Sequence, residues 1–394
     1  PAPVQIDSGY QHTCVAWSNG RASCWGYDCN GQLGDLAEVE DCAFDDPTPP
    51  RSLVPVTVQR ADGDGPLEGV VDVATTYASS CALLEDGTVW CWGGNDAGHL
   101  GDGGVTSEAR PVPVVDSEDA PLQSIVSITA GGHHMCALDE EGTPWCWGAN
   151  GYGQLGLVDW SGADDVRNRA TQAQGGPYAS IDAGGGQTCA IVGSGAPAEV
   201  HCWGRNNLGQ LGYEVAGPDT SAAVQVLRDT TGNPPLLGAV RVGLGNNFTC
   251  AGAFPYSLWC WGQNKRHALG DEAEPAGPDG TTAWMARPNA LVPVTDVVEL
   301  GGGDDFACAR LANGDVHCWG GNADGQIGTG SAAAYEPPSR VLRDAESLAV
   351  GFAQACVITT DRRVLCWGAN DNGQLGDGTE NARDTPTEVR ELCQ

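Results

Sequence analysis

The tripeptide Cys-Trp-Gly occurs seven times in this chain of 394 residues, and no other feature limits the possible folds as strongly. Its cysteines are Cys24, Cys91, Cys146, Cys202, Cys260, Cys318 and Cys366. Successive copies lie between 48 and 67 residues apart. Recurrence at such a period is the signature of a repeat architecture, in which each unit is one small supersecondary structure that cannot bury its apolar face alone.

Each copy lies inside a longer unit with the pattern of four short strands. An apolar strand precedes it, as at 125–128, and leads through glycines to a first cysteine, here Cys136. After Cys-Trp-Gly come a Gly-X-Leu-Gly-like turn, a variable polar segment and often a Pro-X-X-Val strand, as at 111–114. No helical periodicity of comparable length competes with this pattern. The unit therefore predicts one small antiparallel sheet per repeat.

Seven small sheets packed radially cover one another's faces and leave only short exposed edges. We therefore expect an all-β fold, a single domain over residues 1–394 that forms a seven-bladed β-propeller of four-stranded antiparallel blades. A linear solenoid is the alternative, but it needs polar capping repeats at both ends, and the sequence shows none. Segments 3–6 and 386–389 resemble partial blade strands, so we expect them to close the ring in a composite blade.

The cysteine spacing predicts one disulfide inside the hairpin of each repeat. In repeat two, a three-residue loop ending at Gly87 in the left-handed conformation places Cys81 opposite Cys91 in a non-hydrogen-bonded pair. Such pairs have Cα atoms about 4.5 Å apart, within disulfide reach. The predicted pairs are Cys14–Cys24, Cys81–Cys91, Cys136–Cys146, Cys189–Cys202, Cys250–Cys260, Cys308–Cys318 and Cys356–Cys366. Zinc sites need cysteines two to four residues apart, which this spacing does not supply.

Some hairpins depart from this scheme. The loops ending at Gly20, Gly142 and Gly314 allow the same count, but Arg362 and Tyr256 stand in the glycine's place, so we expect those two turns to differ. Repeat four has three extra residues, which we place in a longer loop at 193–195.

Three further cysteines lie outside the hairpins. Cys29 and Cys42 flank an acidic insertion in repeat one, and we expect them to bridge it. Cys393 is the odd cysteine and is a candidate free or intermolecular thiol. Pairing of Cys393 with Cys29 is a minor alternative, because ring closure brings the last strand near repeat one.

Segments 125–156, 297–328 and 348–378 approximate the pattern VxxIxxGxxHTCALxxDGxVxCWGxNxxGQLGDG. This pattern resembles the repeats of the regulator of chromosome condensation family, and the resemblance covers essentially the whole chain in seven units. It implies a seven-bladed propeller, and the paired cysteines look like a secreted, bacterial-like branch. Relatives include a chromatin-bound exchange factor, a plant ultraviolet-B photoreceptor and a secreted inhibitor of β-lactamases, which share the fold and not the site. Protein binding like that of the inhibitor is the nearest analogy.

The formal net charge is −32, from 51 acidic and 19 basic residues. Such a surface repels nucleic acids and anionic membranes. A cationic protein, a calcium ion or a neutral glycan remains open as a partner, although the charge can also serve solubility alone. No run of 18 apolar residues occurs, so no membrane insertion is predicted. Seventeen cysteines indicate an oxidising compartment, that is, a secreted, periplasmic or cell-surface protein.

Motifs of catalysis, metal binding and cofactor binding are not found. The chain contains neither His-Glu-X-X-His nor Gly-X-Ser-X-Gly, and the Gly-X-Gly-X-X-Gly match at 151–156 lacks a following helix. The stretch 371–373 suggests calcium, but its counterparts in other repeats vary too much for an ion loop, so we interpret it as a turn. His12 and His134 precede cysteines, where a structural hydrogen bond is expected. We expect the acidic pairs 164–165 and 304–305 to be solvated rather than catalytic.

Function is therefore sought in the unequal loops, because insertions carry what distinguishes one repeat from another. The longest insertions are 36–66, 157–176, 213–236 and 271–292. Candidate partner-binding residues are Trp160, Trp284, Asp164 and Asp165, with the tryptophans as interface anchors. We expect a non-enzymatic binding propeller that contacts an unidentified protein through insertion loops on one face. The alternatives are a structural subunit of an extracellular or envelope assembly, tethered through Cys393, and a carbohydrate-active enzyme that uses Asp304 and Asp305.

Overall fold

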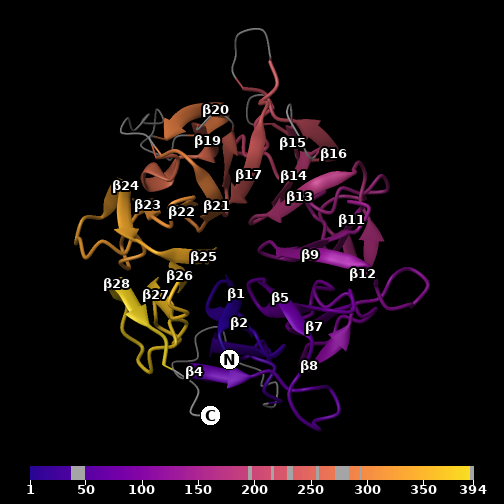
Figure 1. The fold of residues 1–394 in the computed structure, drawn as a ribbon. Helices are drawn as coiled ribbons and strands as arrows, with labels where there is room; N and C mark the ends of the chain where they lie inside the picture. The colour runs from indigo at the N-terminus through magenta and orange to yellow at the C-terminus, as the bar shows by residue number, and fades with distance from the viewer. Residues whose placement is uncertain are drawn as a thin grey trace.

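The structure, a computed structural model, consists almost entirely of short antiparallel sheets arranged in a ring (Figure 1). It describes residues 1–36, 49–193, 198–213, 217–228, 234–253, 257–270, 284–292 (backbone only) and 294–390. Seven four-stranded sheets surround a central axis, and the predicted seven-bladed all-β propeller is confirmed. Among the described residues the single helical element is the 3₁₀ turn η1 (Lys265–His267).

Each blade uses four consecutive strands, ordered from the axis outward. Blade 1 contains β1 (Pro3–Ser8), β2 (His12–Trp17), β3 (Ala22–Tyr27) and β4 (Arg51–Thr57). Blade 2 contains β5 (Val70–Thr75), β6 (Ser79–Leu84), β7 (Val89–Gly93) and β8 (Glu108–Pro113). Blade 3 contains β9 (Ile125–Ala130), β10 (His134–Asp139), β11 (Pro144–Ala149) and β12 (Val166–Gln172). Blade 4 contains β13 (Tyr178–Ala183), β14 (Gln187–Val192), β15 (Glu199–Gly204) and β16 (Thr220–Gln225).

The remaining three blades follow the same order. Blade 5 contains β17 (Ala239–Leu244), β18 (Phe248–Ala253), β19 (Ser257–Gln263) and β20 (Trp284–Val292). Blade 6 contains β21 (Val297–Gly302), β22 (Phe306–Leu311), β23 (Val316–Gly321) and β24 (Tyr335–Leu342). Blade 7 contains β25 (Ala345–Val350), β26 (Gln354–Thr359), β27 (Val364–Gly368) and β28 (Arg383–Glu388).

The ring closes without a composite blade, so that expectation is wrong. Strand β1 pairs with β2 inside blade 1, and β28 pairs with β27 inside blade 7. The first strand is the innermost strand of blade 1, and the last strand is the outermost strand of blade 7. Each sheet is therefore built from four consecutive strands, and the two chain termini belong to different sheets. Closure is instead made between blades: the amide of Phe352 and the side-chain amide of Gln354 both donate to the carbonyl of Gly9, at 3.1 and 3.0 Å.

The hairpin disulfides have the predicted register. Cys81 lies opposite Cys91, and Leu83 lies opposite Val89, around a turn in which Gly87 has φ of 79°. All seven predicted hairpin pairs are formed, with Cα atoms 4.0 to 4.2 Å apart. Cys29 is also disulfide-bonded. Cys42 and Cys393 lie outside the described residues, as do Tyr256 and residues 194–195 of the repeat-four loop.

The turn of repeat seven does not differ from the others, contrary to expectation. Arg362 adopts the left-handed conformation of the glycine that it replaces, with φ of 67°. The same two backbone bonds close the turn, from Arg362 N to Thr359 O at 2.8 Å and from Thr359 N to Arg363 O at 2.9 Å. The guanidinium of Arg362 also lies 3.0 Å from the carboxylate of Glu346. These contacts offset the cost of a left-handed non-glycine residue.

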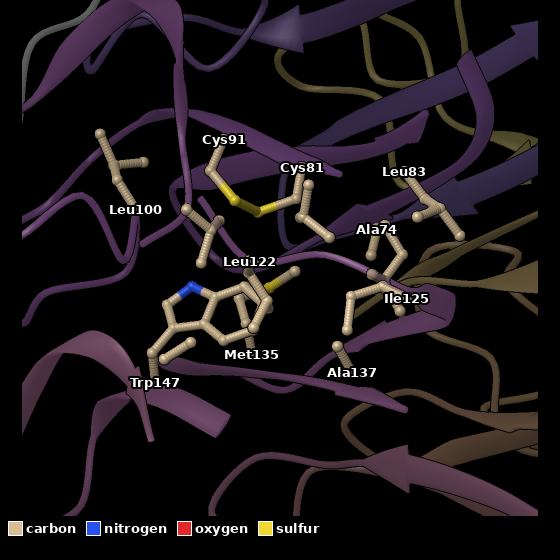
Figure 2. Packing of buried hydrophobic residues seen from close by; sticks show 14 residues of the cluster. Ala74, Cys81, Leu83, Cys91, Leu100, Leu122, Ile125, Met135, Ala137 and Trp147 are labelled. Atoms are coloured by element: carbon tan, nitrogen blue, oxygen red, sulfur yellow. A yellow bond between two sulfur atoms is a disulfide. The ribbon is translucent and has the colours of Figure 1, made fainter. Parts of the chain in front are cut away.

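The tryptophan of each Cys-Trp-Gly joins two blades. All seven are completely buried, and each donates its indole N–H to a main-chain carbonyl in the Gly-X-Leu-Gly-like turn of the preceding blade, at 2.8 to 3.0 Å. Trp25 of blade 1 donates to Gln374 of blade 7, so the series is cyclic. In Figure 2, Trp147 of blade 3 packs among Leu100 and the Cys81–Cys91 disulfide of blade 2.

In six of the seven such turns, the last glycine lies against the tryptophan ring and leaves room for it. Gly101 has φ of 64°, and a Cβ atom at this position would lie 2.9 Å from Cδ1 of Trp147. A side chain is therefore disfavoured both by the backbone conformation and by the close approach of the indole.

Replacing Trp147 with Phe is predicted to lower the free energy of unfolding by about 2 to 4 kcal/mol, because it leaves the His99 carbonyl without its donor and opens a void. Urea unfolding followed by circular dichroism measures the loss. Trp145 is the matched control, since it is the tryptophan two residues before Trp147 on the same strand, is only partly buried, and donates its indole N–H to Asp139. Trp145→Phe should cost less than about 1 kcal/mol. Equal losses in the two variants would show that the indole–carbonyl bond does not hold the blades together.

Candidate functional site

Two kinds of loop share one end of the propeller, which we call the loop face. The turn between the first and second strands lies beside the end of the third strand, since Tyr27 N donates to Gln11 O at 2.9 Å and Gly94 N donates to Ala78 O at 2.7 Å. The loops between third and fourth strands therefore emerge at this same end. The disulfide hairpins and the connections between blades lie at the opposite end, the hairpin face, where Val70 N donates to Gly20 O at 2.8 Å.

The predicted insertions divide between the two faces. The longest segments between third and fourth strands are 28–50 in blade 1 and 264–283 in blade 5, and each leaves its third strand at the loop face. Each predicted insertion combines part of such a segment with a fourth strand, and all except 271–292 also include part of a connection between blades on the hairpin face, such as 58–69. The sequence could not separate these parts, because the fourth strands have weak alternation.

The innermost strands of all seven blades line a central channel with a volume of about 370 Å³. Its carboxylates tie neighbouring blades together. Asp7 accepts bonds from the amide and the hydroxyl of Thr75, at 2.7 and 2.8 Å. Asp182 accepts from the hydroxyl of Thr129 and from the amide of Leu244, both at 3.0 Å. Burial raises the pKa of Asp7 to about 6 and that of Asp182 to about 7, against the opposing effect of these hydrogen bonds.

Seven turns between first and second strands surround the mouth of this channel on the loop face. The middle residues of these turns, in chain order, are Tyr10, Tyr77, Gly132, Gly185, Asn246, Asp304 and Phe352. Blades 7, 1 and 2 thus present aromatic rings, blades 3 and 4 present glycines, and blades 5 and 6 present an amide and a carboxylate. The mouth is therefore chemically asymmetric although its backbone is repetitive.

Tyr10, Tyr77 and Phe352 form a cluster that we call the aromatic collar. The ring centroids of Tyr10 and Phe352 are 4.5 Å apart with an interplanar angle of 71°, and those of Tyr10 and Tyr77 are 5.1 Å apart at 45°. His133, exposed at the edge, packs against Tyr77 at 4.9 Å. Tyr10 keeps 37% of its surface exposed, while Tyr77 and Phe352 are half-buried. Inclined rings at these separations stabilise one another beyond simple burial.

Tyr77 lies across the channel mouth. Its main-chain amide donates to the carbonyl of Gly132 in blade 3, and its hydroxyl donates to Oδ1 of Asn246 in blade 5 at 3.1 Å. A Cβ at Gly132 would lie 3.0 Å from Cζ of Tyr77, so the bare glycine gives the ring its space. Burial, and then the nearby carboxylate of Asp304, raise the pKa of Tyr77 above its usual value, so the phenol stays protonated and keeps donating.

A chain of polar contacts continues from Tyr77 to the long loop of blade 5. Nδ2 of Asn246 donates to Oδ1 of Asp304 at 2.9 Å, and Asp304 forms an ion pair with Lys265, the only lysine of the sequence. The neighbouring Arg266 lies 3.3 Å from Oδ2 of the buried Asp305. The expectation that residues 304–305 are solvated is therefore wrong, because both carboxylates are paired with cations of η1.

Comparisons with known proteins agree with this architecture. The sequence profile of the regulator of chromosome condensation (RCC1) repeat matches residues 70–98, 125–154, 297–326 and 346–374, and a second profile of that repeat matches 86–138 and 361–393. The chain is an RCC1-type β-propeller.

Similar proteins have different lengths and contexts. The E3 ubiquitin-protein ligase HERC2 of Homo sapiens is 28% identical over 344 residues, which are 86% of this chain but only 6% of the ligase. The mitochondrial RCC1 domain-containing protein RUG3 of Arabidopsis thaliana is 27% identical, over 84% of this chain and 72% of its own. Among solved structures, human WBSCR16 has a TM-score of 0.76 at 19% identity, covering 94% of each chain. Prp20p of Saccharomyces cerevisiae has a TM-score of 0.72 at 19% identity, covering 98% of this chain and 86% of its own.

The predicted partner-binding residues differ from one another in burial and in their contacts. Asp164 is exposed, whereas Asp165 is buried, accepts a bond from Nδ2 of Asn150 at 2.7 Å and pairs with Arg167. Trp160 is partly buried, and its indole N–H has no acceptor among the described residues. Trp284 begins β20, and its side chain lies outside the described part of the chain. Trp160, Asp164 and Asp165 belong to the loop between β11 and β12 of blade 3, and their role in partner binding stays a prediction.

His12 and His134 form structural hydrogen bonds, as predicted. Nε2 of His12 lies 2.9 Å from the hydroxyl of Ser80, and Nε2 of His134 lies 2.8 Å from that of Thr188, each bridging to the next blade. The stretch at 371–373 is a turn closed by a bond from Gly373 N to Asn370 O. Within the described residues no group of three or more histidine, cysteine, aspartate or glutamate side chains is placed to hold a metal ion.

The aromatic collar is the feature that sequence reasoning missed. Its residues belong to no motif, and each stands in a different local sequence. One signal was available: Tyr10, Tyr77 and Phe352 each lie four residues before the first cysteine of a repeat. Aligning the repeats on that cysteine brings the seven mouth positions into one column.

The contribution of the channel carboxyls Asp7 and Asp182 to propeller stability is predicted to fall as pH rises from about 4 to about 8. The channel carboxyls ionise near pH 4 in the unfolded chain, but in the folded protein they keep their protons up to about pH 6 for Asp7 and about 7 for Asp182. The folded state thus binds more protons than the unfolded state in this window. The contribution of these carboxyls to the free energy of unfolding therefore decreases as pH rises toward the folded pKa. Asp182→Asn should reduce the difference in unfolding free energy between pH 5 and pH 8 by about 1 to 2 kcal/mol.

The exposed Asp164 is the control for this measurement, because Asp164→Asn removes the same charge from the surface. Its pH profile should match that of the parent protein in urea unfolding. If Asp182→Asn and Asp164→Asn flatten the profile equally, the pH dependence comes from total charge and not from the channel.

Proposed function

We propose that this RCC1-type propeller is a non-enzymatic binding module of an oxidising compartment, secreted, periplasmic or at the cell surface, and that its loop face contacts a partner protein. The observation that carries the proposal is the loop face itself, where the partly exposed aromatic collar surrounds part of the channel mouth and the loops between third and fourth strands begin. Interfaces are enriched in tyrosine and other aromatic side chains, often at well-packed central positions.

Relatives support a role in protein binding. Prp20p has binding properties toward Gsp1p and histones, and it has been solved in complex with Kap60. This chain shares the fold of Prp20p at 19% identity, so the likeness supports protein binding as a class and names no partner.

The arrangement of carboxylates favours binding over catalysis. A glycosidase needs two carboxyl groups that flank a substrate, one of them free to donate a proton. Asp304 and Asp305 are instead neutralised by Lys265 and Arg266, and Asp304 also accepts a bond from Asn246. These contacts hold η1 against blade 6.

The seven hairpin disulfides support the oxidising compartment. In the described part of the chain, no helix is long and apolar enough to cross a membrane. If Cys29 is bridged to Cys42, Cys393 is the one cysteine left over from 17. Protein taken from its native source and denatured without reductant should then react with no more than about one equivalent of a thiol reagent. Recovery of most cysteines as thiols would contradict the proposed compartment.

Affinity capture followed by amide hydrogen exchange tests the binding role. The 394-residue propeller is used as bait in extracts of its source, and exchange is then compared with and without the captured protein. Protection is expected at the mouth turns, such as 9–11 and 76–78, and at loops such as 94–107. Protection confined to the hairpins of the opposite face, such as 85–87, would contradict the proposal, as would a monomer that captures nothing.

A further inference from the structure

We propose that the aromatic collar is the docking site for a basic side chain, lysine or arginine, that projects from the partner protein. This inference rests on the proposed function and names the chemistry of the contact at its centre. It begins from the exposure of Tyr10, which is 37% accessible although it stands at the inner edge of a tightly packed ring.

The collar holds its rings in fixed positions before any partner arrives. Tyr10 packs its ring against Phe352 and Tyr77, and Tyr77 is held at both ends, by Gly132 through its amide and by Asn246 through its hydroxyl. Binding then costs little side-chain ordering, which is the main benefit of preorganisation. The rings are inclined to one another and leave no flat platform for extended stacking.

The face of an aromatic ring attracts cations, and arginine or lysine within about 6 Å of a ring centroid is bound through the ring quadrupole. The loop face already contains one such pair, since the guanidinium of Arg205 lies 5.0 Å from the ring centroid of Tyr152. Tyr152 is therefore engaged within the chain. The described residues place no comparable cation over Tyr10.

Charge complementarity selects a basic occupant over an acidic one. The chain carries a formal net charge of −32, which draws cationic partners and repels anionic ones at a distance. Lys265 and Arg266, beside the mouth turn of blade 6, are paired with Asp304 and Asp305.

Fluorescence anisotropy with two synthetic dodecapeptides tests the inference. One alternates arginine with glycine, the other alternates glutamate with glycine, and both carry the same dye. The variants are Tyr10→Leu, which keeps an apolar side chain but removes the ring, and Tyr10→Phe, which keeps the ring. Tyr335→Ala is the matched control, because Tyr335 is 51% exposed and lies on the outer strand of blade 6.

The arginine peptide is expected to bind the parent protein. Tyr10→Leu should raise the dissociation constant of this peptide by about fivefold or more. Tyr10→Phe and Tyr335→Ala should stay within about twofold of the parent value, and the glutamate peptide should not bind. Thermal unfolding midpoints check that each variant is folded. The comparison of Tyr10→Phe with Tyr10→Leu isolates the effect of the ring, and it does not depend on variants at other collar positions. Equal affinity in Tyr10→Leu overturns the inference. Collar-dependent binding of the glutamate peptide, or of a neutral oligosaccharide added as a third probe, overturns the choice of a basic occupant.

The same variants separate this inference from the proposed function. If a captured partner protects the loop face in hydrogen exchange but binds Tyr10→Leu as tightly as the parent, the basic-side-chain inference fails and the binding role remains. If protection lies only on the hairpin face, the binding role itself fails. If the partner binds Tyr10→Leu more weakly and binds Tyr10→Phe as tightly as the parent, the result supports both the binding role and the basic-side-chain inference.

Discussion

The hydrogen bond from each buried tryptophan to the preceding blade is the contact on which the rest of the ring depends. An indole N–H that is buried without an acceptor is costly, so each tryptophan must find the carbonyl of the neighbouring Gly-X-Leu-Gly-like turn. Seven such bonds run in one direction around the ring, and the one from Trp25 to Gln374 joins the two ends of the chain. They fix the angle between blades and hence bring seven first turns together around one channel mouth.

Local geometry made much of the fold predictable from sequence. The hairpin register followed from the position of Gly87 relative to Cys81 and Cys91, since all three are close in sequence and share one turn. Ring closure was not predictable in the same way, because strands β1 and β28 resemble each other in pattern and the pairing of either strand is a non-local choice. Arg362 shows a further limit: a residue that disfavours a left-handed turn still adopts it where the surrounding hairpin and an ion pair hold it there.

The candidate site was less accessible to sequence reasoning than the fold. Attention to exposed-looking residues favoured Trp160 and Asp165, yet the latter is buried and bonded within its own loop. The aromatic collar is formed by Tyr10, Tyr77 and Phe352, which are far apart in the chain and meet only when the ring is closed. Because the turns are held by backbone bonds, their middle side chains vary from blade to blade without disturbing the scaffold. Side chains that differ from blade to blade thus occur in the turns at the channel mouth as well as in the long loops.

Photo-crosslinking from the mouth tests the central claim, that the loop face at the channel mouth is where this propeller binds. A benzoylphenylalanine placed at position 10, beside the rings of Phe352 and Tyr77, would be irradiated in extracts of the native source and compared with the same residue at position 86 in a hairpin of the opposite face. The account predicts a partner adduct from position 10, attached next to a lysine or arginine of the partner, and none from position 86. An adduct formed only from position 86 would contradict it.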